Sequence, residues 1–374
     1  MADYLGKDIF KLGFGLMRLP KNEDGSIDVP QTSDMVDAFI AAGGTYFDTA
    51  FVYTGSEDAI KQALVDRYPR ESYTLATKLN AWLGEPDREA AKQQLYTSLE
   101  RTGAGYFDFY LLHAIMRTNY ETYEKYGLWD FVKEQKEKGV IKHWGFSFHA
   151  DPDLLEQVLT EHPDVEFVQL QINYADWENP GTASQKCWEI ARKHGVPIVV
   201  MEPLKGGALA DPIPAVRQIF EEANPEAPIV SWGIRYSAGL EGIITVLSGM
   251  SSLEQMEENL SYMKDFRPLN EEEQAIIREA QRVLGESKTI PCTACRYCVE
   301  GCPKQIPIPE IFAAVNLHLG NGQMEEARQN YRAAVSEGHG ASDCIQCRRC
   351  EQACPQHLPI TEHLKQAAEM FIEN

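Results

Sequence analysis

The chain of 374 residues has little positive charge and no long apolar run. Its 35 lysines and arginines stand against 56 aspartates and glutamates, which gives a formal net charge of -21 at pH 7. This charge argues against nucleic acid and anionic membrane surfaces as partners, because both would be repelled, and it favours positively charged redox partners. The sequence contains no stretch of about 18 apolar residues, so it predicts no membrane-spanning helix.

A basic start followed by an apolar stretch is also missing at the N-terminus, so we do not expect a secreted protein. Structural disulfides are typical of small secreted scaffolds, whereas this chain is long enough, at 44% hydrophobic residues, to fill at least two domains without them. Free thiolates then indicate a reducing, cytoplasmic location, in an organism that lives with little oxygen.

Eight of the nine cysteines form a doubled motif near the end of the sequence. Each copy reads CxxCxxCxxxCP, and this is the ligand pattern of bacterial-type ferredoxins, where three cysteines hold one 4Fe-4S cluster and the fourth reaches the other. Zinc fits poorly, because it usually takes two separated pairs of ligands or histidine. The motif predicts two 4Fe-4S clusters, held by Cys292, Cys295, Cys298, Cys302, Cys344, Cys347, Cys350 and Cys354. The ninth, Cys187, lies in a predicted helix and is expected in the core.

Before the cysteines, short β-branched or aromatic runs alternate with helical patterns. They predict strands at 12–17, 46–50, 73–79, 107–113, 141–148, 167–174, 198–204 and 243–248. Eight strands within about 260 residues, without a GxGxxG turn, favour an α/β (β/α)8 TIM barrel over a doubly wound sheet. We predict this barrel over residues 1–284, ending in a helix that Asn270 caps, and a small, mainly helical ferredoxin-like domain over 285–374.

Four polar residues stand at or just beyond the predicted ends of successive strands: Asp48, Tyr53, Lys78 and His113. Active sites of TIM barrels lie at this end of the strands. Taken singly, each residue has a structural explanation: a helix cap, a packing tyrosine, a solvated lysine and a satisfied core histidine.

Together, and in this order, the four residues resemble the catalytic tetrad of the aldo-keto reductases. The likeness runs through GFGLMRLP, FDTAFVYTGSE, ATKL, DFYLLH, GFSFH, VQLQINY, MEPLKGG and SGMSSLEQMEEN, and the cysteine motif makes the chain similar to the branch with a C-terminal 4Fe-4S domain. The resemblance implies an oxidoreductase that interconverts a carbonyl and an alcohol. Tyr53 would act as the acid, Lys78 would favour its phenolate, Asp48 would fix Lys78, and His113 would polarise the substrate oxygen.

The resemblance also implies a nicotinamide cofactor, NAD(P)H, in the barrel. Four positions depart from the family pattern, which commonly has asparagine in place of Phe148, an aromatic ring near Met201, and basic residues near Gly249 and Gln255. These losses weigh against tight binding of a 2'-phosphate and affect NADH less. The expected cofactor contacts are Ser147, Phe148, Gln169, Met201, Pro203, Leu204, Gly206, Gly207, Gly249, Gln255, Glu258 and Asn259.

Flavin (FMN) is an alternative in the barrel, because iron-sulfur clusters pass one electron and nicotinamide passes two as hydride, whereas flavin can do both. Backbone amides of Gly206 and Gly207 suit a flavin phosphate as well as a pyrophosphate. Substrate contacts are expected from Arg18, Trp82 and Trp177, although each also has a structural explanation.

The leading hypothesis is that the two clusters relay electrons to or from the barrel active site. The partners would be a small carbonyl or alcohol substrate and a soluble electron carrier such as ferredoxin or flavodoxin. Two alternatives stay open: the clusters are a structural or redox-sensing clamp on a self-sufficient barrel enzyme, or the chain is a redox-sensing binding protein. The four intact tetrad residues argue against the last one.

Overall fold

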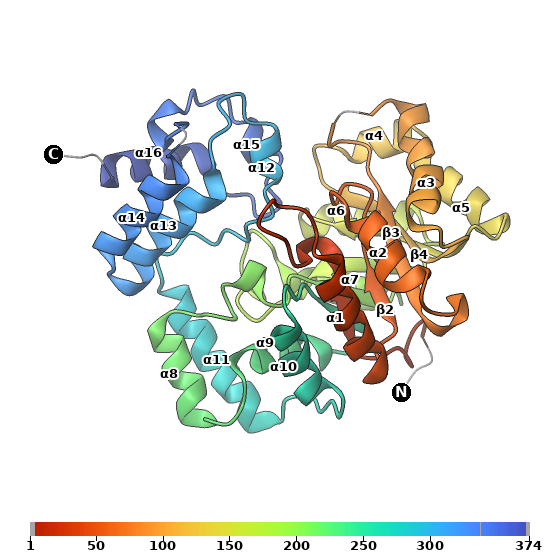
Figure 1. Cartoon of the computed structure of the whole chain (residues 1–374), viewed down its shortest axis with the longest axis horizontal. Helices are drawn as coiled ribbons and strands as arrows, with labels where there is room; N and C mark the ends of the chain where they lie inside the picture. Colours follow the sequence, from red (N-terminus) through yellow and green to blue (C-terminus); the bar gives the residue numbers. More distant parts are fainter. Residues whose placement is uncertain (1–3, 85, 337, 372–374) are drawn as a thin grey trace. The chain divides into compact units, whose positions relative to one another are not determined.

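The computed structural model describes residues 4–84, 86–336 and 338–371. The chain forms two compact units: one runs up to Pro203 and resumes from Ile234 to Leu269, and the other contains Leu204–Gly233 and the residues from Asn270 onward. Figure 1 shows their elements coloured along the sequence. Across the described residues, no helix has both the length and the apolar character that crossing a membrane requires.

Eight parallel strands close into a barrel in the first unit, each paired with its neighbours in chain order and β8 paired with β1. All eight predicted strands are present and the predicted TIM barrel is confirmed. The strands are β1 (Leu12–Gly15), β2 (Tyr46–Asp48), β3 (Thr74–Leu79), β4 (Phe107–Ile115), β5 (Ile141–Phe148), β6 (Phe167–Gln171), β7 (Ile198–Met201) and β8 (Ile243–Ser248).

Side-chain caps begin many of the helices between these strands. Asp28, Asp87, Asp151 and Ser252 each accept a hydrogen bond from a backbone N–H of the first turn, which satisfies a donor that the helix leaves without an intrahelical partner. The helices are α1 (Val29–Ala41), α2 (Ser56–Ile60), α3 (Arg88–Thr102), α4 (Tyr120–Lys125), α5 (Leu128–Glu137), α6 (Pro152–Glu161), α7 (Ser184–Lys193), α9 (Ile229–Ala238) and α10 (Leu253–Met263), with the short 3-10 helices η1 (Leu16–Arg18) and η3 (Arg70–Ser72) and the π-helix η2 (Lys61–Val65).

Apolar side chains fill the interior of the barrel. Phe109 and Phe167 meet there with their ring centroids 4.9 Å apart. Gly145 of β5 has to lack a side chain, because a Cβ would lie 2.2 Å from the carbonyl oxygen of Phe167. The cluster consists of Tyr46, Ala76, Phe109, Leu111, Phe167, Val199, Ile244 and Leu247. Side chains alternate between the two faces of a strand. The residues two positions beyond the members of this cluster on β2 to β7 therefore also point inward, near the carboxyl ends of the strands.

The regular elements of the second unit are helices across its described residues. The predicted capping box at the start of α11 is confirmed, because the side chains of Asn270 and Glu273 each bond to the other's backbone N–H. Helix α8 contacts α11, and α13 contacts both α14 and α16 (Figure 1). The helices are α8 (Pro214–Ala223), α11 (Glu271–Gly285), α12 (Tyr297–Glu300), α13 (Ile308–Asn321), α14 (Met324–Ala334), α15 (Arg349–Gln352) and α16 (Ile360–Met370), with turns η4 (Lys205–Gly207) and η5 (Ala341–Asp343). The predicted boundary at 284/285 stays a prediction.

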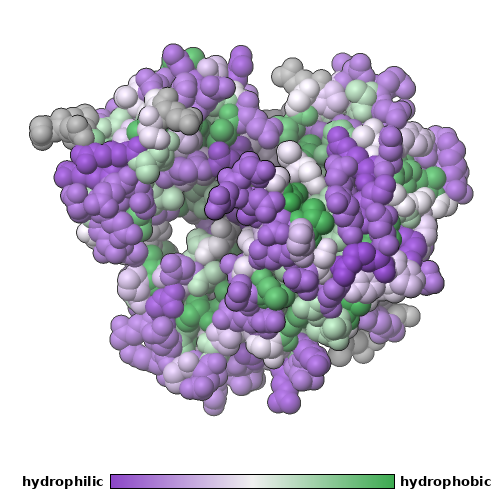
Figure 2. Space-filling model, viewed as in Figure 1, coloured by the Kyte–Doolittle hydropathy of each residue, from purple (hydrophilic) through white to green (hydrophobic). Residues whose placement is uncertain are grey.

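The two copies of the cysteine motif adopt the same backbone conformation. Left-handed φ values recur at equivalent positions: 52°, 68° and 52° at Ala294, Arg296 and Gln305, and 56°, 59° and 52° at Gln346, Arg348 and His357. Cys298, Cys350 and Cys354 are buried in one apolar cluster with residues such as Phe312 and Leu364. The core of this unit is thus built around the cysteines, while hydrophilic side chains predominate on the molecular face seen in Figure 2.

Candidate functional site

Asp48 and Lys78 form a buried ion pair at the carboxyl ends of β2 and β3. The Lys78 Nζ lies 2.5 Å from Asp48 Oδ1 and also donates to the carbonyl oxygen of Thr49 over 2.6 Å. The side chains of the pair are 1% and 4% exposed. The same Nζ lies 5.1 Å from the centroid of the Tyr53 ring, and this ring meets the His113 ring edge-on at 5.8 Å. The structure thus brings together all four residues of the predicted tetrad.

Burial shifts the pKa values of three of these groups. It raises the pKa of Asp48 and lowers the pKa of Lys78, because each ion loses its hydration, while their mutual attraction opposes both shifts. Burial also holds the pKa of His113 well below its ordinary value, and Lys78 and His149 lower it further. His113 is therefore neutral near pH 7 and can donate a hydrogen bond from one ring nitrogen.

His113 is presented by an irregularity in β4. The pairing of β4 with β5 shifts register between Leu112 and Ile115, and the backbone of Ala114 is left-handed at φ 53°. Such a conformation costs a non-glycine residue on the order of 1–3 kcal/mol, so its surroundings must hold it in place. Ser147 Oγ does so by accepting the N–H of Ala114 at 2.7 Å, and a tyrosine hydroxyl donates to the carbonyl oxygen of His113. Sequence reasoning placed the end of the strand at His113 and missed this bulge.

Glu57 is a buried carboxylate that sequence reasoning also missed. It lies in the first turn of α2, where its Oε1 accepts the Thr77 hydroxyl over 2.8 Å and its Oε2 pairs with Arg101 at 3.2 Å. Its negative charge raises the pKa of Lys78 against the effect of burial. Acidic residues are common in the first turn of a helix because of the helix dipole. The sequence around Glu57 therefore did not distinguish a buried site residue from an ordinary helix-start residue.

Three of the predicted cofactor residues extend from the inner face of the barrel. Ser147, Gln169 and Met201 stand two positions after Gly145, Phe167 and Val199, which border the filled interior. Ser147 and Gln169 are register partners on β5 and β6 and are 1% and 3% exposed. The Oε1 atom of Gln169 is buried, with no hydrogen-bond partner among the described residues. A carboxamide N–H group would satisfy this acceptor, so these residues fit a nicotinamide.

Phe148 has the opposite orientation along β5. Its ring lies 6.1 Å from that of Phe146, whose ring in turn lies 5.8 Å from Trp129 of α5. The side chain of Phe148 therefore packs with the layer of helices outside the barrel, which accounts for an aromatic residue where the family commonly has asparagine.

Arg18 lies against Gly249 in the segment that follows β8. A Cβ at Gly249 would be 3.4 Å from the Cδ of Arg18. Gln255 and Glu258 are exposed on α10, whereas Asn259 is buried and donates to a serine hydroxyl of β8 over 3.1 Å. Arg18, predicted to contact substrate, thus borders the segment that was predicted to hold the cofactor.

The loop after β7 packs against the first cysteine loop. From Leu204 onward, after Pro203, it belongs to the second unit. Gly206 has a left-handed φ of +67°, and a Cβ there would lie 2.2 Å from the carbonyl oxygen of Thr293, so only glycine fits. The neighbouring Gly207 has φ +106° and faces open space. The loop predicted to hold a cofactor phosphate therefore touches the residue that follows Cys292.

The two tryptophans predicted to line the substrate site have packing partners as well. The Trp177 ring lies 5.8 Å from both Trp188 of α7 and Tyr236 of α9. Trp82 is partly exposed after β3, and its backbone N–H donates to the Asn80 side chain over 3.0 Å. A role in substrate binding stays a prediction for both.

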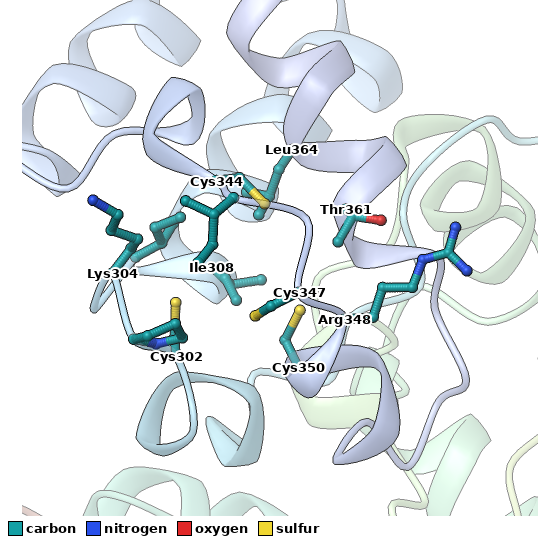
Figure 3. A pocket seen from close by; sticks show the side chains of 12 residues that line it. Cys302, Lys304, Ile308, Cys344, Cys347, Arg348, Cys350, Thr361 and Leu364 are labelled. Carbon is teal, nitrogen blue, oxygen red and sulfur yellow. The ribbon is translucent and has the colours of Figure 1, made fainter.

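The eight cysteines of the doubled motif line two cavities of the second unit. Both cavities are open to solvent. Cys292, Cys295, Cys298 and Cys354 line one, and Cys302, Cys344, Cys347 and Cys350 line the other (Figure 3). The last cysteine of each motif has crossed to the other cavity, as the ferredoxin pattern predicts, and four sulfurs around one space fit a 4Fe-4S cluster. Cys187 is buried in α7 with its pKa raised to about 12 by burial, which confirms its place in the core.

Comparison with known proteins gives two matches along the chain. Residues 11–282 match the aldo/keto reductase family, and residues 291–359 match a 4Fe-4S dicluster domain. An uncharacterized oxidoreductase of Bacillus subtilis is 23% identical over 299 residues, which are 71% of this chain and 90% of that protein. The alpha 1 subunit of the acetyl-CoA decarbonylase/synthase complex of Methanosarcina barkeri is 31% identical over 81 residues, 22% of this chain and 8% of that subunit.

Solved structures share the barrel. An aldo-keto reductase of Bacillus halodurans in its holo form superposes with a TM-score of 0.59 at 24% identity, over 74% of this chain and 95% of that one. An aldo/keto reductase of Klebsiella pneumoniae in complex with NADP and acetate gives a TM-score of 0.59 at 20% identity, over 73% of this chain and 92% of that one. Both likenesses confirm the fold.

Proposed function

Because this chain belongs to the aldo/keto reductase family and carries a C-terminal 4Fe-4S dicluster domain, we propose that it interconverts a carbonyl and an alcohol in its barrel and exchanges single electrons through two clusters. The observation that carries the carbonyl chemistry is the buried Asp48–Lys78 pair with the Tyr53 ring 5.1 Å from the ammonium and 5.8 Å from the ring of His113.

Each tetrad side chain has one task in this proposal. Neutral His113 donates a hydrogen bond to the substrate oxygen, and the Tyr53 hydroxyl gives its proton to the same oxygen as negative charge develops there. Lys78 stabilises the phenolate that remains, and Asp48 keeps Lys78 in place. In the reverse direction Tyr53 takes the proton from an alcohol.

A reduced nicotinamide, when bound, supplies hydride to the carbonyl carbon. Ser147 and Gln169 would hold its carboxamide. Arg18 beside Gly249 offers a cation in a region whose own segment, residues 248–259, has no basic residue. Relatives from Klebsiella pneumoniae have been solved with NADP and with NADPH, which supports nicotinamide over flavin here.

The clusters, when bound, supply one-electron exchange. Reduction of one carbonyl to an alcohol takes two electrons and two protons. Two one-electron exchanges therefore balance one turnover when the electrons come from a one-electron carrier.

Anaerobic assays of the full chain test both halves of this proposal. With NADPH and a panel of aldehydes and ketones, Tyr53→Phe should lower turnover by roughly 100-fold or more, since it removes the proton donor. A variant with Cys295→Ser and Cys347→Ser should keep NADPH-dependent turnover and lose turnover driven by reduced ferredoxin. Unchanged activity in Tyr53→Phe would count against a catalytic barrel and favour a binding protein. Unchanged ferredoxin-driven turnover in the cysteine variant would make the clusters structural.

A further inference from the structure

The two cysteine loops share a backbone conformation but differ in what covers them. Thr293 and Ile345 are equivalent, because each directly follows the first cysteine of its motif. Thr293 is 2% exposed, with its backbone against Gly206. Ile345 is 58% exposed, more than any other large hydrophobic side chain of the described residues. One loop is therefore covered by the chain itself, and the other presents an apolar side chain to solvent.

The uncovered loop belongs to the more accessible cysteine cavity. Cys347 is exposed, whereas the other cysteines of the two motifs are buried or partly buried. An electron passes between proteins more readily at a redox centre that lies near the surface. The cavity of Cys347 is thus the natural point of exchange with solvent-borne carriers, and the cavity next to Thr293 is the one near the loop after β7.

Two cations line this accessible cavity although the whole chain is acidic. Its lining includes Lys304 and Arg348 and no carboxylate, and Figure 3 shows these two side chains on opposite sides of the sulfur atoms. Among the described residues Arg348 has one ion-pair partner, Glu351, and the two charged groups lie 3.8 Å apart. The single cation lining the other cavity, Arg296, is in a close ion pair with Glu310.

We infer that the docking surface formed by Lys304, Ile345, Cys347 and Arg348 binds a small acidic protein that carries one electron. Ile345 supplies an apolar contact that excludes water, and the two cations complement a negative face on the carrier. The net charge of -21 favours a basic partner at long range. Salt screens charges beyond about 8 Å under physiological conditions, however, so the charges at the contact decide which partner fits.

The exchange at this surface moves one electron and no atoms. The reduced carrier leaves oxidised by one electron, and the cluster domain is reduced by one. The inference rests on the proposed function, since it presumes clusters that take part in redox chemistry.

The test is anaerobic stopped-flow reduction of the full, cluster-loaded chain by reduced bacterial ferredoxin, an acidic one-electron carrier, followed by the loss of cluster absorbance. The rate constants are compared at about 0.15 M salt, where a Debye length of about 8 Å screens the net charges of the two acidic proteins. Lys304→Glu and Arg348→Glu should each lower the second-order rate constant by about tenfold, because they reverse a charge at the contact. Ile345→Gln should lower it as well, because it removes the apolar contact.

Matched controls come from the same unit. Lys365→Glu makes the same charge change on exposed α16, and Leu319→Gln makes a similar polar change at a side chain that is 37% exposed. Both should stay within about twofold of the wild-type rate constant. Dithionite should reduce every variant at the wild-type rate, which shows that the clusters are intact.

Three outcomes would overturn the docking surface: unchanged rate constants in both Lys304→Glu and Arg348→Glu, equal effects of Arg348→Glu and Lys365→Glu, or a wild-type dimer that Arg348→Glu dissociates without slowing ferredoxin. The last result would assign the surface to a second copy of the chain. If dithionite bleaches no absorbance in the wild type, the proposed function fails instead. If ferredoxin reduces the protein as expected but carbonyls never reoxidise it, the surface stands and only the barrel chemistry is lost.

Discussion

Replacing Lys78 by methionine should destabilise the barrel by about 3–5 kcal/mol, the usual result of removing one partner of a buried ion pair. Methionine is of similar size, so the loss arises from electrostatics rather than from a cavity. The Asp48 carboxylate, 4% exposed, would lose the ammonium 2.5 Å away. In a domain of this size 1 kcal/mol corresponds to about 2–4 °C, so we expect the Tm to fall by about 6–20 °C. The deficit should shrink at lower pH, because protonation of Asp48 removes the unpaired charge.

Thermal unfolding of the anaerobic protein, followed by tryptophan fluorescence, measures this loss. The variant with both Lys78→Met and Asp48→Asn should be at least about 2 kcal/mol more stable than the sum of the single changes predicts, because it leaves no buried charge behind. Lys138→Met is the control, since Lys138 pairs with Glu134 at a site where both side chains are more than half exposed, and it should not shift the Tm. Additive single changes, within about 0.5 kcal/mol, would refute the coupling of Asp48 and Lys78.

Changes at His113, at the glycine pair and at the cysteines test the rest of the molecule. The folded-state pKa of His113 is lowered, so its contribution to stability is present above its unfolded pKa of about 6.5 and falls by about 1.4 kcal/mol between about pH 7.5 and 5.5. His113→Gln should remove that part of the pH dependence of unfolding, and identical pH profiles would contradict the burial of a neutral imidazole. Gly206→Ala would bring a Cβ to 2.2 Å from the Thr293 carbonyl oxygen and should cost more bound iron than Gly207→Ala, which faces open space; equal iron contents would count against the contact. Serine at Cys292, Cys295, Cys298 and Cys354 should leave one complete cavity and about four iron atoms, whereas serine at Cys292, Cys295, Cys298 and Cys302 leaves three ligands in the second cavity and should retain less iron. Equal iron in these two variants would mean that the motifs do not cross.

Much of the fold was predictable because its signals are local. Alternating and apolar runs marked all eight strands, and Asn270 with Glu273 marked the start of α11, since these patterns depend on neighbours a few residues apart. The spacing of the cysteines indicated two clusters for the same reason. The order of Asp48, Tyr53, Lys78 and His113 along successive strands was enough to expect them at one end of a barrel.

Other features of the site depend on residues that the sequence separates widely. The bulge that presents His113 needs the Ser147 hydroxyl from the next strand, and the burial of Glu57 depends on Thr77 and Arg101. The inward face of β5 carries Ser147 and the outward face carries Phe148, which packs with the helices. No local pattern reports such cross-strand relations, because they arise when the barrel closes.

The sequence by itself determined that this protein has a barrel with a tetrad at its strand ends and eight thiols for two clusters, because periodicity and spacing carry that information directly. Tertiary structure alone decided that Gly206 lies against Thr293 and that Ile345 is exposed while its equivalent is covered. The two cysteine motifs have the same spacing of cysteines and proline. They differ in environment because the loop after β7 covers one of them, and that contact joins segments far apart in the chain.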